Sequence, residues 1–183
     1  MPICQACQTE MEPKFISFYV DGHKATSIYD YNPFIRKLIY QYKGCYDFEL
    51  HQVFLNMYAK ELKVRYFDHI VIPIPSYKDE DEERGFNHVM EIVKNLGLSV
   101  MDILEKTEQH KQAVSTVKER KTVYKYLGLK QRVDLSKKKV LIVDDVYTTG
   151  STMKSAINLI EKLNPRQIDI LVVAKTKPKC KLK

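Results

Sequence analysis

The clearest hydrophobic pattern along the chain is a short continuous apolar run at 140–143, followed by a helical repeat. The run VLIV is rich in β-branched residues and shows no polar alternation, which is typical of a strand buried on both faces of a sheet. After Gly150 the apolar positions recur at helical spacing, on Met153, Ala156, Ile157, Ile160 and Leu163. The segment therefore predicts a strand, a polar turn and a helix.

Similar patterns predict three more strands, near 69–74, 99–104 and 168–174. Together with the strand at 139–144 they indicate an α/β protein whose central, mainly parallel sheet runs from about residue 68 to 176. The stretch 105–138 is polar and weakly periodic, which favours a mobile hood over a site.

Three amphipathic helices accompany these strands. The first ends at the turn at Gly44, and its apolar face is Ile35, Leu38, Ile39 and Tyr42. The second has its apolar face on Leu50, Val53, Phe54, Met57 and Tyr58. The third is closed by Gly97, and its buried face is Phe86, Val89, Met90, Val93 and Leu96.

Composition limits the class of protein. A chain of 183 residues with 44% hydrophobic and 29% charged residues predicts one main globular domain with a small appendage. The start MPICQACQTEM has no basic and apolar signal pattern, and no run is long enough to cross a bilayer, so we expect a cytoplasmic protein without membrane insertion. The net charge of +7 is concentrated in a basic tail at 175–183, which either binds a polyanion or is a solvated terminus.

The polar residues that follow the strand at 139–144 carry the strongest chemical signal. Asp144 and Asp145 are expected at the carboxyl end of a parallel strand, where open α/β sheets bind ligands, and their oxygens suit ribose hydroxyls or a hydrated Mg²⁺. The next turn combines hydroxyls, backbone N–H groups and a glycine at a helix start, which is typical of an anion site: Thr148, Thr149, Gly150, Ser151 and Thr152. A ribose 5-phosphate fits both parts. The alternative is a polar strand end that only caps a helix.

The stretch VLIVDDVYTTGSTM resembles the phosphoribosyl pyrophosphate (PRPP) binding motif of type I phosphoribosyltransferases. Three further stretches, YNPFIRKLIYQYKG, IPIPSYKDEDEERGFNH and the spaced pair Gln112 and Arg120, narrow the resemblance to the ComF family of phosphoribosyltransferase-like competence proteins. The resemblance covers roughly residues 1–176. It implies a type I phosphoribosyltransferase-like α/β domain that is preceded by two helices and a partial zinc-ribbon-like N-terminus.

The resemblance also implies roles for individual residues. Asp144 and Asp145 would hold the ribose hydroxyls, and the turn with its preceding residues Val146 and Tyr147 would hold the 5-phosphate. The diphosphate, bound with Mg²⁺, would contact Ser76, Tyr77, Lys78 and Arg84. If the site is catalytic, the reaction is substitution at the anomeric carbon of PRPP, with Asp144, Asp145 and Arg84 as catalytic residues and positioning and electrostatics as the protein's contribution.

Some positions depart from the family pattern or are ambiguous. Five successive carboxylates at 79–83 stand in an expected loop that tends to be basic in relatives, and a solvated flap is the favoured interpretation. Relatives favour Arg at the place of Lys106 and Asn at the place of Val123. Lys37 and Lys43 lie in the family-like segment but fit equally well as surface charges, so they are not named as site residues; the alternative for His88 is a polar surface residue.

Cys4 and Cys7 have the spacing of a zinc knuckle, but they provide only half of a tetrahedral site. Cys45 and Cys180 are isolated. We therefore divide the chain into a partial zinc-ribbon-like segment at 1–30 and a phosphoribosyltransferase-like domain at 31–183, with a helical lead-in at 31–66.

Two functions remain open at this point. The first is a PRPP-binding protein of natural competence that handles incoming single-stranded DNA, with a competence helicase or processing protein as a possible partner. The second is an active Mg²⁺-dependent phosphoribosyltransferase with an unknown acceptor. No sequence signature of a nucleic-acid-binding fold is present, so the residues alone do not decide between them.

Overall fold

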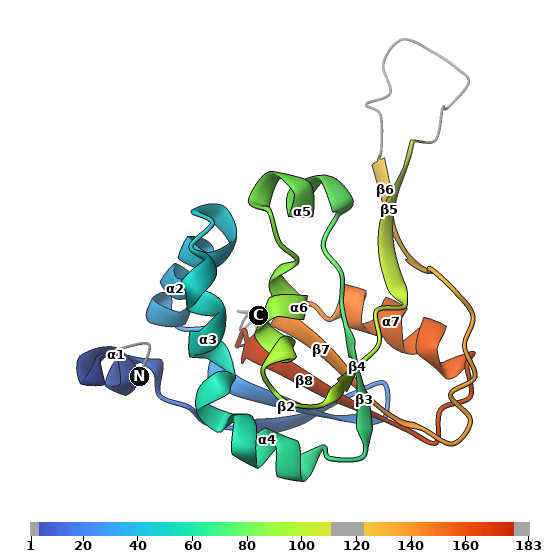
Figure 1. Cartoon of the computed structure of the whole chain (residues 1–183), viewed down its shortest axis with the longest axis horizontal. Helices are drawn as coiled ribbons and strands as arrows, with labels where there is room; N and C mark the ends of the chain where they lie inside the picture. The colour runs from blue at the N-terminus through green and yellow to red at the C-terminus, as the bar shows by residue number, and fades with distance from the viewer. Residues whose placement is uncertain (1–3, 111–122, 178–183) are drawn as a thin grey trace, which may run out of the picture.

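A six-stranded sheet in the order β1-β2-β8-β7-β3-β4 forms the middle of the protein in the computed structural model, which describes residues 4–110 and 123–177 (Figure 1). The inner strands are parallel: β8 (Gln167–Lys175), β7 (Lys139–Tyr147) and β3 (His69–Pro73). The expected α/β fold and three of its four strands are thus confirmed. The fourth, predicted at 99–104, is split between a two-residue strand β4 (Ser99–Val100) and the start of β5.

The sheet also includes the first part of the chain. Strands β1 (Ile16–Val20) and β2 (His23–Asp30) form an antiparallel hairpin, and β2 pairs in parallel with β8. We expected a sheet confined to about residues 68–176. The sheet instead also contains two strands from residues 16–30. The sequence signal was an Asp-Gly turn at Asp21 and Gly22, both of which have positive φ, between two runs rich in aromatic and β-branched residues.

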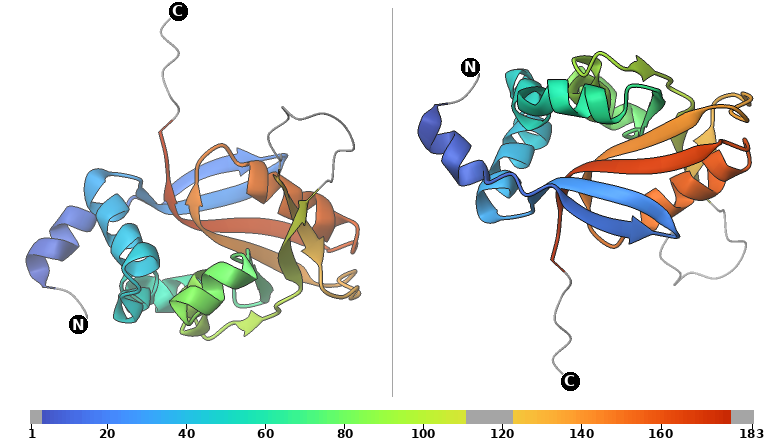
Figure 2. Two further views of the ribbon diagram at one scale, coloured as in Figure 1. Left: turned by 90° about the horizontal axis from the view of Figure 1, so that it is seen from above. Right: turned by 90° about the horizontal axis from the view of Figure 1, so that it is seen from below.

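Helices cover both faces of this sheet (Figure 2). On one face, residues of α2 (Pro33–Gly44), α3 (His51–Phe54), α4 (Ala59–Arg65) and α6 (His88–Lys94) pack with Val71, Leu141 and Leu171. On the other face, α7 (Ser151–Glu161) packs on Val140, Ile142 and Ile170. Neighbouring residues of β7 thus enter opposite cores, as the uninterrupted apolar run predicted.

The remaining helices are short. Helix α1 (Gln5–Met11) buries Met11, and the expected single helix around 50–58 is instead a series of turns, η1 (Phe48–Leu50), α3 and η2 (Asn56–Tyr58). The interpretation as one helix was wrong because the regular helix is interrupted at Leu55, whose φ of −117° departs from the usual helical value of about −63°. In the part of the chain that the structure describes, no helix has the length and apolar character needed to cross a bilayer.

Two segments near the carboxyl ends of the strands differ from expectation. The carboxylates at 79–83 lie on helix α5 (Lys78–Arg84), not on a loop, because three of them occupy the first turn, where the helix dipole favours negative charge. Most of them are exposed, as expected for solvated residues. The predicted hood forms an antiparallel hairpin of β5 (Leu104–His110) and β6 (Val123–Leu129) that projects beyond the sheet in Figure 1; Gln112 and Arg120 lie outside the described residues.

Candidate functional site

The carboxyl ends of β3 and β7 bring two predicted groups of polar residues together. Pro73 pairs with Val143, and the N–H of Ile74 donates to the carbonyl of Val143 at 2.8 Å, so the loop at 76–78 lies beside Asp144 and Asp145. His88, at the start of α6, lies between the two groups. Its Nδ1 is 2.6 Å from the Ser76 hydroxyl, and its Nε2 is 3.5 Å from Oδ2 of Asp145.

Asp145 is buried and fully engaged with the protein. Its Oδ1 accepts from the N–H of Val146 at 2.8 Å, and its Oδ2 accepts from the Lys43 ammonium at 2.8 Å. Burial by itself raises the pKa of Asp145, but the hydrogen bond from His88 and the charge of Lys43 outweigh it and hold that pKa well below its ordinary value. Asp145 is therefore an ionised anchor that draws α2 and α6 toward β7.

Asp144 is in the opposite electrostatic situation. Burial and the negative charge of Asp145 raise the pKa of Asp144 to about 8, although Lys106 on β5 opposes this shift. Asp144 is half-buried, and its Oδ1 accepts from the N–H of Asp145 at 2.9 Å. The carboxyl pair is thus divided into one ionised anchor and one proton-bearing group that is available to a ligand with hydroxyls.

His88 is 4% exposed, which excludes the alternative of a polar surface residue. Burial lowers its pKa, which favours the neutral ring. Nδ1 faces two donors, the Ser76 hydroxyl at 2.6 Å and Arg84 Nη1 at 3.3 Å, so the chemistry of its partners assigns the ring proton to Nε2, which faces Asp145. The ring thereby fixes the Ser76 side chain relative to Asp145.

Arg84 is surrounded by protein acceptors. Its Nη1 lies 3.1 Å from Oδ1 of Asp81 and 3.4 Å from both the Ser76 hydroxyl and the Phe86 carbonyl, and its Nε donates to the Lys43 carbonyl at 3.3 Å. Only 5% of its side chain is exposed. The structure therefore places this guanidinium as a scaffold that ties α5 to α2 and to the 76–78 loop.

The turn at 148–152 joins β7 to α7 and has the features of an anion site. Gly150 is the N-cap of α7 with a φ of 80° and no side-chain cap, and Thr148, Thr149 and Ser151 are exposed. A Cβ at position 150 would overlap the Tyr147 hydroxyl, so both the space and the backbone angle require glycine. The start of this helix can offer backbone N–H groups and hydroxyls to a phosphate.

Lysines from other elements complete the surroundings of the loop. Lys78 is 86% exposed and pairs at 3.5 Å with Glu82, whereas the Lys106 ammonium lies 5.5 Å from the centre of the Tyr77 ring. A cavity of about 780 Å³ adjoins the loop, with Pro75, Phe86 and Met90 among its apolar lining. It offers room beside the carboxylates for a further part of a ligand.

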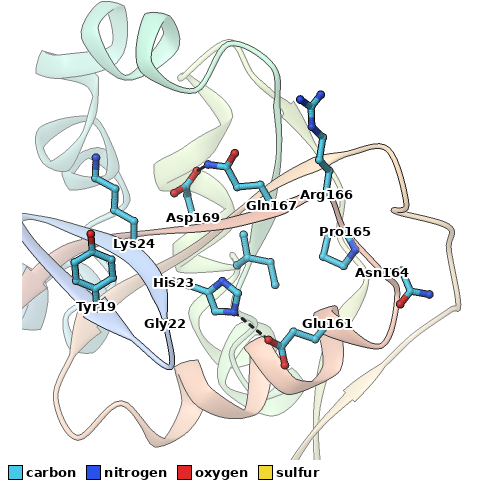
Figure 3. Close-up of a pocket in the computed structure, with 11 residues that line it drawn as sticks. Tyr19, Gly22, His23, Lys24, Glu161, Asn164, Pro165, Arg166, Gln167 and Asp169 are labelled. Carbon is cyan, nitrogen blue, oxygen red and sulfur yellow. Dashed lines mark hydrogen bonds and ion pairs between the residues drawn. The ribbon is translucent and has the colours of Figure 1, made fainter.

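A second cavity, of about 690 Å³, lies at the opposite edge of the sheet, around the amino end of β8 and the β1–β2 turn (Figure 3). His23 and Glu161 pair across it at 3.0 Å, and Asp169 is held by Gln167 at 2.6 Å and by His69 at 2.8 Å. None of the predicted site residues lines it.

The zinc half-site remains a prediction. Cys4 is the N-cap of α1 and Cys7 lies one turn later, and hydrogen bonds from Cys7 lower the pKa of the Cys4 thiol. Within residues 4–110 and 123–177, no group of three or more His, Cys, Asp or Glu side chains is arranged to hold a metal ion. Cys180 lies outside these residues.

Lys43 and His88 belong to the site although the sequence interpretation set them aside, and Lys106 approaches it. A helical pattern predicts that α2 buries Tyr42, but it cannot show that the next residue reaches a strand 102 positions later. Only His88 had a local signal, which concerned its position in the helix. It directly follows Asn87, a typical N-cap residue, whose side chain accepts from the Met90 N–H at 2.9 Å, so His88 is the first residue of α6.

The chain is similar to several known proteins. The family model described as the phosphoribosyl transferase domain matches residues 82–183. Among solved structures, a purine phosphoribosyltransferase from Pyrococcus horikoshii is similar with a TM-score of 0.48 and 19% identity, over 68% of this chain and 73% of that one. An adenine phosphoribosyltransferase from Saccharomyces cerevisiae is similar with a TM-score of 0.45 and 16% identity, over 93% and 87% of the two chains.

Two curated relatives are more specific. The competence protein ComFC of Streptococcus pneumoniae is 30% identical over 165 residues, which cover 90% of this chain and 71% of the relative. The competence protein ComFC of Bacillus subtilis is 27% identical over 139 residues, which cover 74% of this chain and 58% of the relative. The residues that carry the site and these two matches together show that the chain belongs to the ComFC family and contains a phosphoribosyltransferase domain.

Proposed function

We propose that this protein binds PRPP through Asp144 and the 148–152 turn, and that it works in genetic competence, as the names of its relatives suggest. One observation carries the proposal of PRPP binding. The half-buried Asp144 carboxyl, near the carboxyl end of a parallel strand, stands shortly before a glycine-capped helix start. Hydroxyl recognition and phosphate recognition are thus adjacent, which matches a ribose 5-phosphate.

The two parts of the site would take different parts of this ligand. Asp144 would bind the ribose hydroxyls, and the α7 start with Thr148, Thr149 and Ser151 would bind the 5-phosphate. The diphosphate would then lie toward Ser76, Tyr77 and Lys78. Mg²⁺ fits as a companion of the diphosphate, because the donors on this side, the Ser76 hydroxyl and the α5 carboxylates, are the hard oxygen groups that hydrated Mg²⁺ prefers; bound there, it would neutralise the diphosphate.

The geometry favours binding over fast turnover. Departure of a diphosphate requires positive groups that stabilise the developing charge, and Arg84 is occupied by Asp81 and by carbonyl oxygens. Carboxylates on α5 surround the same region. We therefore keep phosphoribosyl transfer to an unknown acceptor as the second possibility, with slow turnover as its expected form.

Addition of PRPP with Mg²⁺ is expected to stabilise the protein against heat. Ligand at about 100 times its Kd contributes about 2.7 kcal/mol, because it binds only the folded state. Asp144→Asn should remove most of this shift, since it replaces the group that meets the ribose hydroxyls. The measurement is a thermal unfolding series with PRPP, ribose 5-phosphate and MgCl₂ alone. A wild-type protein that shows no shift with either phosphosugar would contradict the proposal.

Single-stranded DNA is the second ligand that we propose, and a specific surface on α2 favours it. A cavity of about 630 Å³ is lined by Tyr31, Asn32, Pro33, Arg36, Lys37 and Tyr40. The Tyr40 ring is 65% exposed, and Arg36 and Lys37 are exposed beside it. Exposed aromatic rings interleaved with cations suit stacked bases and a phosphate backbone.

Arg36→Ala with Lys37→Ala should lower affinity for single-stranded DNA and reduce its salt dependence. Loss of two phosphate contacts reduces the slope of log K against log salt by about 1.4. Tyr40→Ala should weaken binding by about 1–3 kcal/mol, the usual contribution of one stacked base. Fluorescence anisotropy with a labelled oligonucleotide between 50 and 300 mM salt is the measurement. Tyr19→Ala is the matched control, because Tyr19 is 74% exposed and lies at the opposite edge of the sheet.

A further inference from the structure

The proposed diphosphate side of the site has one exposed cation, Lys78, which pairs with Glu82 at 3.5 Å, and Arg84 does not provide a second. Four of its interactions are with protein groups, and 5% of its side chain is exposed. Its Nη1 and Nε contact Asp81 and the Lys43 carbonyl, and its Nη2 lies 4.0 Å from Glu80. A guanidinium that is enclosed by these groups is poorly placed to reach a phosphate.

Lys43 has the accessibility that Arg84 lacks. Its side chain is 34% exposed, and its ammonium donates to Oδ2 of Asp145 at 2.8 Å. An ammonium has three N–H donors. Within residues 4–110 and 123–177, Lys43 uses one of them for Asp145, which leaves two for a ligand. Lys43 can therefore keep Asp145 while it donates to a ligand.

The backbone around Lys43 fixes the direction from which it acts. Its carbonyl accepts from Arg84 Nε at 3.3 Å, the neighbouring Tyr42 hydroxyl donates to the His88 carbonyl at 2.8 Å, and the Tyr46 hydroxyl donates to Glu83 at 2.7 Å. These contacts join the end of α2 to α5 and α6. Lys43 thus lies near Ser76, because Arg84 contacts both the Lys43 carbonyl and the Ser76 hydroxyl, the latter at 3.4 Å.

We propose that Lys43 is a ligand-binding residue that contacts the diphosphate of PRPP, and that Arg84 positions it through its backbone carbonyl. The inference rests on the proposed function, because it assigns a contact within the same site. It also makes α2, which lies outside the 82–183 phosphoribosyltransferase match, a part of that site. The 79–83 carboxylates strengthen the need for this cation, since they disfavour a bare diphosphate nearby.

A purely structural role of Lys43 is the competing explanation, and a ligand panel separates the two. If Lys43 only holds Asp145 in place, its loss should weaken every ligand that uses the site. If it contacts the diphosphate, its loss should weaken PRPP and Mg²⁺-diphosphate but leave ribose 5-phosphate nearly unchanged. The two explanations therefore differ in the pattern across ligands, not only in the size of the effect.

The experiment is isothermal titration of the full chain with PRPP, ribose 5-phosphate and inorganic diphosphate, all with Mg²⁺. For Lys43→Met we expect PRPP and diphosphate affinities to fall by tenfold or more, and ribose 5-phosphate affinity to change by less than threefold. Lys60→Met, on the exposed side of α4, is the matched control and should match the wild type. An equal loss for all three ligands, or wild-type affinity for PRPP, would overturn the assignment.

Lys43→Met leaves Asp145 with one fewer partner and can lower stability, so a second variant is needed. Lys43→Met with Asp145→Asn removes both charges, and it should fold while remaining weak for diphosphate. Recovery of diphosphate binding in this double variant would show that Lys43 acts only through Asp145 and would overturn the proposal. A wild-type protein that binds neither PRPP nor ribose 5-phosphate would instead refute the proposed function, and this inference with it.

Discussion

Asp145→Ala is expected to lower the free energy of unfolding by about 3 kcal/mol at pH 7, a large effect for one side chain. Removing one member of a buried ion pair typically costs 3–5 kcal/mol, because the other charge is left without compensation. The lower end applies here, since a third of the Lys43 side chain is exposed and can be partly rehydrated. The Val146 N–H also loses its acceptor, and the buried His88 ring loses the carboxylate 3.5 Å from its Nε2.

Urea unfolding of the wild type, Asp145→Ala and Asp144→Asn at pH 7 tests this expectation. Asp144→Asn is the matched control at the neighbouring position, and it should not lower stability, because it removes a carboxyl whose ionised form is disfavoured by the fold. Lys43→Met combined with Asp145→Ala should recover part of the loss. If Asp145→Ala changes stability by less than about 0.5 kcal/mol, the size of an ordinary surface substitution, Asp145 is not the anchor that we infer.

The main elements of the site could be predicted from sequence because their signals are local. The run at 140–143, the acidic pair and the glycine turn are contiguous, and strand, turn and helix follow one another without a long-range contact. Their location at the ligand-binding end of the sheet follows from a general rule, namely that open α/β sheets bind ligands at the carboxyl ends of their parallel strands. The prediction that the 76–78 loop lies beside the pair required only that β3 and β7 be neighbours, which their pairing confirms.

The partners of Asp145 could not be predicted, because they depend on packing between distant segments. Lys43 and His88 reach this carboxylate from α2 and α6, and neither helix has a sequence pattern that fixes its position over β7. The same packing surrounds Arg84 with acceptors. For this reason Arg84, which the family resemblance assigned to the diphosphate, instead holds neighbouring segments of the protein together. The electrostatic roles within the pair follow from these contacts and not from the DD dipeptide.

The N-terminal hairpin shows a different kind of failure. Asp21 and Gly22 carry a strong turn signal, but no strand was predicted on either side of them. In the structure, Tyr29 is fully buried against the main core, and its hydroxyl donates to the Phe54 carbonyl at 3.2 Å. A local signal for the hairpin therefore existed without being used, whereas its membership in the central sheet depended on the pairing of β2 with β8.

The carboxyl pair leads to a second large expected effect, on the pH dependence of stability. Relative to the wild type, Asp144→Asn is expected to gain stability as the pH rises from about 4 to about 8. The pKa of Asp144 is about 8 in the folded protein, whereas an unfolded chain gives an aspartate about 3.9. The folded state thus favours protonated Asp144. The stability contributed by this preference is complete below the unfolded pKa and is lost as the pH rises through the folded pKa.

Asparagine has nearly the same shape and no charge, so the variant escapes this loss. One pKa unit corresponds to about 1.4 kcal/mol, and the full shift would give about 6 kcal/mol. We expect about 2–3 kcal/mol at pH 8, because Asp144 is only half-buried and water reduces the penalty on its charge. Asp145 acts in the opposite direction, since its depressed pKa affects stability only toward acid pH.

Urea unfolding of the wild type and Asp144→Asn at intervals between pH 5 and 9 measures the difference in a range where Asp145 stays ionised. The expected result is that the stability advantage of Asp144→Asn over the wild type grows with pH, while the variant no longer responds to PRPP. The two results together would show that the fold retains a destabilising carboxylate because the ligand requires it. Such an exchange of stability for binding is common at functional sites. A difference that stays constant over this range would show that Asp144 ionises normally in the folded protein, and the division of roles within the pair would then be wrong.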